Sequence, residues 1–113
     1  MMKKEGFPES IRIKKKKEWE KVVKKGERLS SRNLSVLRLK TEEKKTKFGI
    51  GIRSGIKGAV KRNRIKRLLR EIVRKNKEKF SPGEKVILIY RSKEVGISYQ
   101  ELLNEFLKLV ENF

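Results

Sequence analysis

Three of the side chains that proteins most often use for chemistry are missing: the 113 residues include no cysteine, no histidine and no aspartate. Without cysteine there is no disulfide framework and no thiolate metal site. Without histidine there is no side chain that ordinarily shuttles protons near neutral pH. The common catalytic triads and thiol nucleophiles are therefore excluded. No group of glutamates resembles a two-metal site, so we expect a protein that binds rather than one that catalyses.

Long apolar runs are also missing. No segment approaches the roughly 20 apolar residues that a membrane-spanning helix needs. The basic residues near the start have no apolar run behind them, as a signal peptide would. We therefore expect a cytoplasmic protein that makes no membrane contact.

Positive charge is abundant, with 33 lysines and arginines against 14 acidic residues and a formal net charge of +19. Such an imbalance repels itself unless a polyanion supplies the opposite charge, and nucleic acid is the usual polyanion. The segment from Lys57 to Lys79 contains only two acidic residues, Glu71 and Glu78. Solvated helix faces usually mix both signs. We therefore predict that this segment binds phosphate groups.

The apolar pattern predicts one domain of helices and strands. Residues 1–12 are expected to be a flexible tail, and residues 13–113 a single RNA-binding domain. Helix and strand patterns alternate in the order helix, two strands, long helix, strand, helix. Their approximate ranges are 16–25, 29–39, 48–52, 59–78, 86–90 and 98–113. This order predicts a two-layer α/β (α+β) sandwich with a small sheet.

Two faces are expected on the second strand and two on the long helix. Phe48, Ile50 and Ile52 alternate with Gly49 and Gly51, and a glycine face often marks the close approach of another element. On the long helix, an apolar arc should face the core: Ile65, Leu68, Leu69, Ile72 and Val73. The outward side of this helix is basic.

The stretch AVKRNRIKRLLRE, residues 59–71, closely resembles the signature of the bacterial ribonuclease P protein subunit, in which Arg-Asn-Arg opens a long helix. The resemblance extends to KKKKEWEKVVKKGERLSSR, KFGIGI, KVILIYR and SYQELLNEFLKLV, and it covers about residues 11–112. It implies a small mixed sheet with the long basic helix in a left-handed βαβ crossover, as in ribosomal-protein-like folds. Strand and helix physics alone would favour the right-handed connection.

The resemblance also implies partners and a division of labour. An RNA subunit with bound Mg²⁺ cleaves the 5′ leader from precursor tRNA, and the protein assists without catalysing the reaction itself. The expected partners are therefore the ribonuclease P catalytic RNA and precursor tRNA, with no DNA. No cofactor is expected on protein side chains alone.

Matching this sequence to the family signature gives the candidate RNA-binding residues: Lys61, Arg62, Asn63, Arg64, Lys66, Arg67 and Arg70. Arg53 and Lys57 are added because they keep, in displaced positions, the charge of a Ser-Lys-Lys run that the family often has before its glycine turn. Arg62 and Arg64 are expected outside the buried arc, where their loss should barely change stability.

A cleft for the single-stranded leader is implied between the first helix and the sheet, at Trp19, Val23 and Leu37. Val23 and Leu37 stand where the family often has aromatic side chains, so stacking on bases is expected to be poorer here. Trp19 has two interpretations, a hydrophobic staple on the sheet or a base-stacking platform. The alternative for the whole protein is a stand-alone structural RNA binder, such as a small ribosomal protein.

Overall fold

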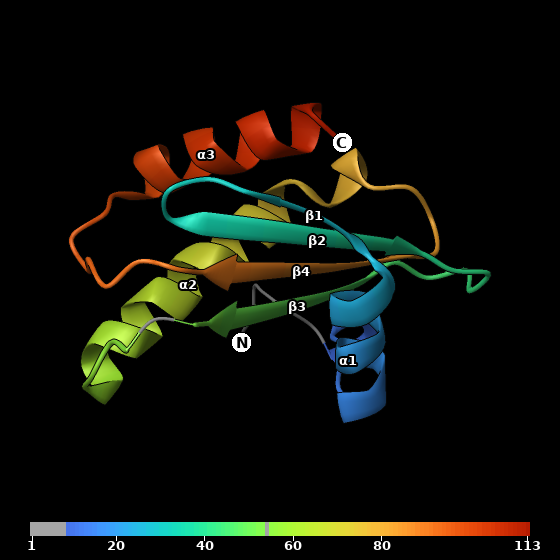
Figure 1. Cartoon of the computed structure of the whole chain (residues 1–113), viewed down its shortest axis with the longest axis horizontal. Helices are drawn as coiled ribbons and strands as arrows, with labels where there is room; N and C mark the ends of the chain where they lie inside the picture. Colours follow the sequence, from blue (N-terminus) through green and yellow to red (C-terminus); the bar gives the residue numbers. More distant parts are fainter. Residues whose placement is uncertain (1–8, 54) are drawn as a thin grey trace, which may run out of the picture.

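The computed structural model describes residues 9–53 and 55–113 (Figure 1). In these ranges the chain forms three α-helices, two short 3₁₀ turns and one sheet. In chain order they are η1 (Glu9–Ile11), α1 (Lys16–Lys25), β1 (Glu27–Ser30), β2 (Leu34–Lys40), β3 (Lys47–Ile52), α2 (Ala59–Lys75), η2 (Lys77–Lys79), β4 (Glu84–Tyr90) and α3 (Tyr99–Glu111).

The sheet is mixed, with strand order β1-β2-β4-β3. β4 is central, antiparallel to β2 and parallel to β3. Its apolar run from Val86 to Tyr90 is almost wholly buried, because helices cover both faces of the sheet here. The expected tail, residues 1–12, lies mostly outside the described residues. Its last four residues form η1 and a parallel bridge from Arg12 to Phe48 at the β3 edge.

The prediction of one strand over residues 29–39 is wrong, because the chain turns there and forms the β1–β2 hairpin. The turn is closed by the Ser31 amide, which donates to the Leu34 carbonyl at 2.7 Å. Glu105 of α3 accepts hydrogen bonds from the Asn33 amide at 3.0 Å and from the Asn33 side chain at 2.6 Å. The partner that holds this turn is therefore 72 residues away in the chain.

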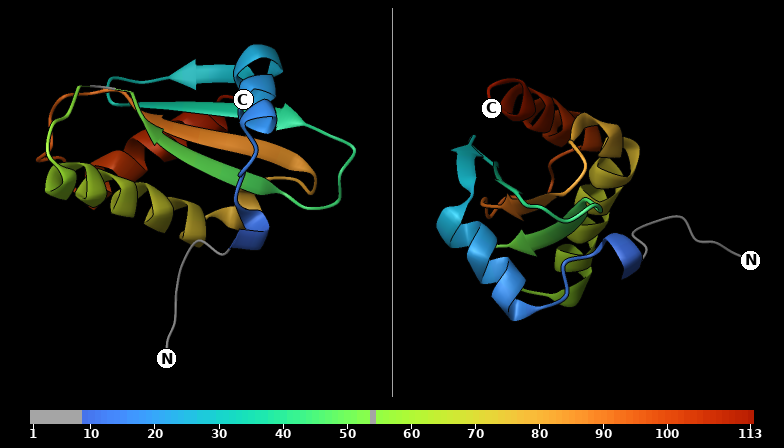
Figure 2. Two further views of the ribbon diagram at one scale, coloured as in Figure 1. Left: turned by 90° about the horizontal axis from the view of Figure 1, so that it is seen from below. Right: turned by 90° about the vertical axis from the view of Figure 1, so that its right-hand side faces the viewer.

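Helices cover both faces of the sheet, as the views in Figure 2 show. α2 and α3 lie on one face over the larger apolar cluster, which includes Phe48, Val86, Leu88 and Phe106. α1 lies alone on the other face. From β3 the chain passes through α2 to the parallel neighbour β4, and Figures 1 and 2 show this crossover to be left-handed. The expected mixed α+β fold is confirmed.

The long helix is buried as its pattern predicts, but it ends earlier. Ile65, Leu69, Ile72 and Val73 are fully buried, and Leu68 is half-buried. α2 stops at Lys75 rather than at residue 78. Here Asn76 turns its side-chain amide back onto the Ile72 carbonyl at 2.8 Å, a local bond that competes with helix continuation.

The last helix begins with a capping box. The Ser98 hydroxyl accepts from the Glu101 amide, and the Glu101 carboxylate accepts from the Ser98 amide, both at 3.1 Å. Leu102, Phe106 and Leu109 are its buried residues.

Candidate nucleic-acid interface

The first two turns of α2 project beyond the ends of β3 and β4 (Figure 1). From residue 57 to residue 64 every residue is described and none is buried, and Val60 is 84% exposed. The helix begins at Gly58, whose φ of 96° is a conformation that side-chain-bearing residues rarely adopt. Its first turn contains no acidic residue and no side-chain cap. Basic side chains therefore surround the positive end of the helix dipole, a combination that attracts anions.

The two arginines of the signature triplet contact the protein itself. Arg64 donates to the Val95 carbonyl at 2.6 Å and to the Ile97 carbonyl at 2.7 Å. Arg62 is half-buried and donates more weakly, at 3.3 Å, to the Ile56 carbonyl. Both side chains lie outside the buried arc, as expected, but they also donate to loop carbonyls, which the sequence pattern does not reveal.

The other motif residues are directed outward. Lys61, Asn63, Arg67 and Arg70 are exposed and Lys66 is half-exposed. Within the described part of the chain their side chains make no hydrogen bond or ion pair with another residue. Their donors therefore remain available to a partner along roughly the first three turns of α2.

Charge is balanced only near the other end of α2. Glu71 forms a bidentate pair with Arg74, at 2.8 and 3.0 Å, and a longer contact with Lys75. The hydrogen bonds from Arg74 hold the pKa of Glu71 below its usual value. Arg53 and Lys57, in the connection between β3 and α2, are exposed. They extend the unbalanced charge towards the sheet.

The indole ring of Trp19 in α1 packs against the glycine face of β3. A Cβ atom at Gly49 would lie 2.7 Å from the indole ring, and one at Gly51 would lie 3.2 Å away. The predicted close approach at these glycines is therefore the approach of Trp19. These contacts favour the staple interpretation of Trp19, and the indole remains partly exposed beside them.

The other two residues predicted for the leader cleft differ in their exposure to solvent. Val23 is 42% exposed on α1, whereas Leu37 has no accessible surface and lies beneath α1 with Val22 and Ile87. Leu37 therefore cannot touch an RNA strand in this structure. Arg28 of β1 pairs in register with Leu37 and is exposed on the same face. The sequence pattern did not identify Arg28 as part of this surface, because the side of the sheet on which it lies follows from the pairing of β1 with β2.

Ion pairs fasten the start of α1 to the sheet. Lys85 of β4 is 5% exposed and donates to Glu18 of α1 at 2.7 Å and to Glu43 at 2.9 Å. Lys47 of β3 adds a contact to Glu18 at 3.5 Å. The hydrogen bond from Lys85 lowers the pKa of Glu18, so the pair stays charged well below neutral pH. The position of α1 is therefore held by charge as well as by Trp19.

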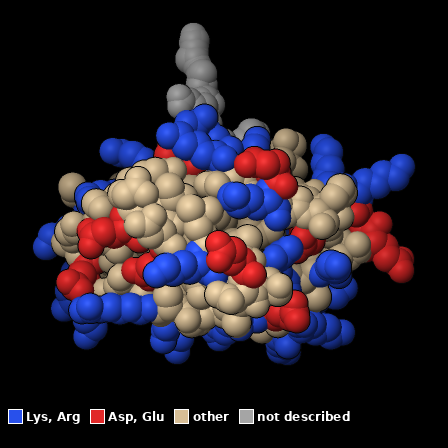
Figure 3. Space-filling model, turned by 90° about the horizontal axis from the view of Figure 1, so that it is seen from above, with Lys and Arg blue, Asp and Glu red and all other residues tan. Residues whose placement is uncertain are grey.

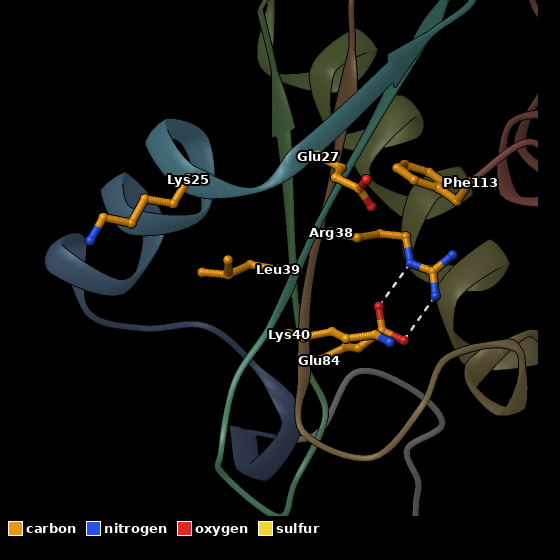
Figure 4. A pocket seen from close by; sticks show the side chains of 7 residues that line it. All are labelled: Lys25, Glu27, Arg38, Leu39, Lys40, Glu84 and Phe113. Carbon is orange, nitrogen blue, oxygen red and sulfur yellow. Dashed lines mark hydrogen bonds and ion pairs between the residues drawn. The ribbon is translucent and has the colours of Figure 1, made fainter.

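A shallow pocket of about 420 Å³ lies where the ends of α1, β2 and α3 meet (Figure 4). Its floor is the pair of Arg38 and Glu84, joined by two hydrogen bonds of 2.8 Å. Burial by itself would raise the pKa of Glu84, but the bonds from Arg38 and from the Ser81 amide lower it. The Arg38 guanidinium also lies 5.0 Å from the Phe80 ring and 4.9 Å from the Phe113 ring. These contacts explain the pair as part of the fold.

Among residues 9–53 and 55–113, no three His, Cys, Asp or Glu side chains cluster to hold a metal ion. Five glutamates already form ion pairs or hydrogen bonds with basic or amide groups of the protein: Glu18, Glu43, Glu71, Glu84 and Glu105. The protein side chains described therefore do not fit a Mg²⁺ site. No described helix is long and apolar enough to cross a membrane.

The side of the molecule over α3 differs from α2 in charge. α3 carries Glu101, Glu105 and Glu111 against Lys108. Figure 3, which looks down on this side, shows acidic and basic side chains interspersed among other residues. The interspersed charges over α3 thus contrast with the acid-free first turn of α2.

Fold and charge together define a small, strongly basic α+β protein. A family model described as "Ribonuclease P" matches residues 7–113. The ribonuclease P protein component of Pelotomaculum thermopropionicum is 31% identical over 99 residues, and the match covers 88% of each chain. That of Finegoldia magna is 34% identical over 98 residues, covering 87% of this chain and 86% of the other. The chain belongs to the ribonuclease P protein family and is a ribonuclease P protein subunit.

Solved structures agree with this assignment. The RNase P protein of Staphylococcus aureus superposes with a TM-score of 0.79 at 25% identity, covering 90% of this chain and 94% of the other. The RNase P protein from Thermotoga maritima gives a TM-score of 0.77 at 24% identity, covering 90% and 96%. The second likeness supports the fold.

Proposed function

We propose that this chain binds the catalytic RNA of ribonuclease P through the start of α2 and assists removal of the 5′ leader from precursor tRNA. The observation that carries the proposal is the acid-free, solvent-directed set of donors at Lys61, Asn63, Arg67 and Arg70. Charged donors that lack an internal partner bind phosphate oxygens without first breaking an ion pair. Membership of the ribonuclease P protein family supports RNA as the polyanion, and it disfavours a stand-alone ribosomal protein.

The single-stranded leader is proposed to lie along the α1 face of the sheet. There Val23 and part of Trp19 offer apolar contact, and Arg28 offers a cation for phosphate. Leu37 supports this surface from beneath. Because Trp19 already packs on Gly49 and Gly51, at most one face of the indole remains for a base. Phosphate and apolar contact should therefore contribute more to leader binding than aromatic stacking does.

Cleavage itself is assigned to the RNA subunit. Mg²⁺ is proposed to be held mainly by RNA, since the described residues include no cluster of three His, Cys, Asp or Glu side chains. The protein contributes charge neutralisation and leader positioning, and protein freed of all RNA should show no metal-dependent nuclease activity. A cytoplasmic location fits this role.

Reconstituted cleavage tests the proposal. Precursor tRNA is incubated with a bacterial ribonuclease P RNA at low Mg²⁺, with and without this protein, and the mature 5′ end is measured. The protein should raise kcat/KM for precursor tRNA, and it should do so less for a substrate with a one-nucleotide leader. No stimulation by protein that demonstrably binds the RNA would contradict the proposed function.

A salt titration tests the electrostatic part separately. Each neutralised phosphate contributes about −0.9 on duplex, or about −0.7 on a single strand, to the slope of log affinity against log salt. Six or more contacts therefore predict a slope of roughly −4 or steeper. A slope near −1 in a filter-binding assay would be incompatible with the basic surface of α2.

A further inference from the structure

The first two turns of α2 should be difficult to keep helical. Residues 59–64 bury no side chain, and the stretch carries three basic residues and no acidic one. Like charges beside the positive end of the helix dipole destabilise the terminus, and short helical segments without packing are marginal in water. The lack of a side-chain cap at Gly58 removes another usual source of support. These turns nevertheless extend about 9 Å before the first buried residue, Ile65.

One side chain from these turns reaches a fixed part of the molecule through two strong bonds. The two terminal nitrogens of Arg64 donate to the carbonyls of Val95 and Ile97, 31 and 33 residues further along the chain. Hydrogen bonds from a charged donor are stronger than neutral ones. The planar guanidinium also fixes the direction of both bonds at once.

The acceptors are themselves well anchored. Ile97 is 8% exposed and belongs to the larger apolar cluster, and the next residue, Ser98, caps α3. At the other end of this loop, the Tyr90 hydroxyl donates to the Glu94 carbonyl. The carbonyls that Arg64 contacts thus belong to a loop held at both ends.

We propose that Arg64 is a positioning residue: its two hydrogen bonds to the Val95 and Ile97 carbonyls hold the projecting turns of α2 helical, so that Lys61, Asn63 and Arg67 are presented to RNA already in place. The proposal rests on the proposed function of this surface and adds a division of labour inside it. Arg64 acts through its neighbours, and preorganisation of those neighbours spares the ordering cost that binding would otherwise include.

The experiment compares Arg64→Ala, Arg64→Lys and the matched control Arg67→Ala in the full-length protein. Arg67 is exposed on the same helix and its side chain has no partner among the described residues. Amide hydrogen exchange by NMR is measured on the free protein for residues 62–66, with residues 69–73 as an internal reference for global unfolding. Affinity for a bacterial ribonuclease P RNA is measured in parallel.

Arg64→Ala should accelerate exchange of residues 62–66 by tenfold or more while leaving the reference amides unchanged, and Arg67→Ala should not alter protection. Both variants should weaken RNA binding. Arg64→Lys keeps the charge but not the planar fork, so it should restore neither protection nor affinity. Val60 is exposed, and alanine is a stronger helix former than valine. Adding Val60→Ala to Arg64→Ala should therefore slow amide exchange of residues 62–66 by about two- to threefold relative to Arg64→Ala alone.

Two results would overturn the positioning role. One is unchanged protection of residues 62–66 in Arg64→Ala. The other is recovery of RNA affinity by Arg64→Lys without recovery of protection, since a charge that binds phosphate directly would behave in this way. Failure of the proposed function looks different: Arg67→Ala would leave RNA affinity unchanged, whereas the exchange results on free protein would stand.

Discussion

The two faces of the sheet are packed by different means. On the face under α2 and α3, apolar side chains from β2, β3, β4 and both helices form one continuous buried cluster. On the face under α1, the described part of the chain contributes four buried apolar residues: Ile13, Val22, Leu37 and Ile87. Trp19 on two glycines and the pairs of Lys85 complete the contact there.

The difference separates stability from binding. Apolar burial is the main favourable term in folding, so most of the stability should reside under α2 and α3. The face under α1 depends on one ring, two glycines and a few charges, and part of it remains open. Variants on the first face should therefore change unfolding, and variants on the second should change how α1 sits and how RNA binds.

The largest effect is expected from Leu69→Ala in the closed core. Leu69 is fully buried, and Leu→Ala changes in such cores cost about 2–5 kcal/mol of unfolding free energy through lost burial and the cavity left behind. Urea unfolding of the variant measures the loss. Leu39→Ala, at a half-buried position on the α1 face, is the matched control and should cost clearly less. Equal losses would contradict the proposed difference between the faces.

An effect of similar size is expected from Arg38→Met. It leaves Glu84, 1% exposed, without its charged partner, and breaking a buried pair in this way costs about 3 kcal/mol or more. Replacing both partners, with Arg38→Met and Glu84→Leu together, should recover most of the loss, because no charge then remains buried. A double variant as unstable as the single one would show that the pair itself, rather than the orphaned charge, sets the cost.

The same pair predicts a dependence on pH. The pKa of Glu84 is lowered in the folded protein from 4.5, so its stabilising contribution is present above that value and is lost as the pH falls through the lower folded pKa. In Arg38→Met the burial that raises the pKa of Glu84 is opposed only by the Ser81 amide and Lys40, so the neutral form of Glu84 is favoured more than in the parent protein. The penalty of Arg38→Met should therefore shrink as the pH falls towards 4, as measured by urea unfolding across pH. A penalty independent of pH would exclude Glu84 as its cause.

A moderate loss of stability is expected from Gly49→Ala, on the face of the sheet under α1. The added methyl would lie 2.7 Å from the Trp19 ring, so α1 must shift, at a cost of about 1–3 kcal/mol. Gly51→Ala, with 3.2 Å to the same ring, should cost less and serves as the control. Trp19 fluorescence and melting report the shift. Indistinguishable variants would mean that Trp19 does not pack as described.

The smallest effect on stability is expected from Arg67→Ala, which lies on neither face. Exposed substitutions of this kind usually stay within about 0.5 kcal/mol, whereas the loss of one phosphate contact should reduce the salt slope by about 0.9. A thermal melt and an RNA titration together check both expectations. A marked fall in melting temperature would mean that Arg67 supports the fold.

The predictable parts of the fold depend on neighbours in sequence. The limits of α1, the glycine face of β3, the buried arc of α2 and the Ser98 capping box follow from periodicity and local hydrogen bonding. The hairpin turn at residues 31–33 could not be predicted in this way. Leu34 to Leu37 are all buried, so no apolar–polar alternation marks the start of β2, and the turn is held by Glu105 from the distant helix α3. The left-handed crossover came from family resemblance, since the general rule favours the other hand.

By itself, the sequence determined that this protein is a small binder with a basic helix whose apolar arc faces a sheet, because charge, composition and the 3.6-residue period are properties of the chain alone. Tertiary structure decided which of those basic side chains are available. It buried Leu37, laid Trp19 on Gly49 and Gly51, and turned Arg64 onto two loop carbonyls more than 30 residues away. The physical reason is that a donor's partner is chosen by proximity in space, which only the packing of distant segments creates.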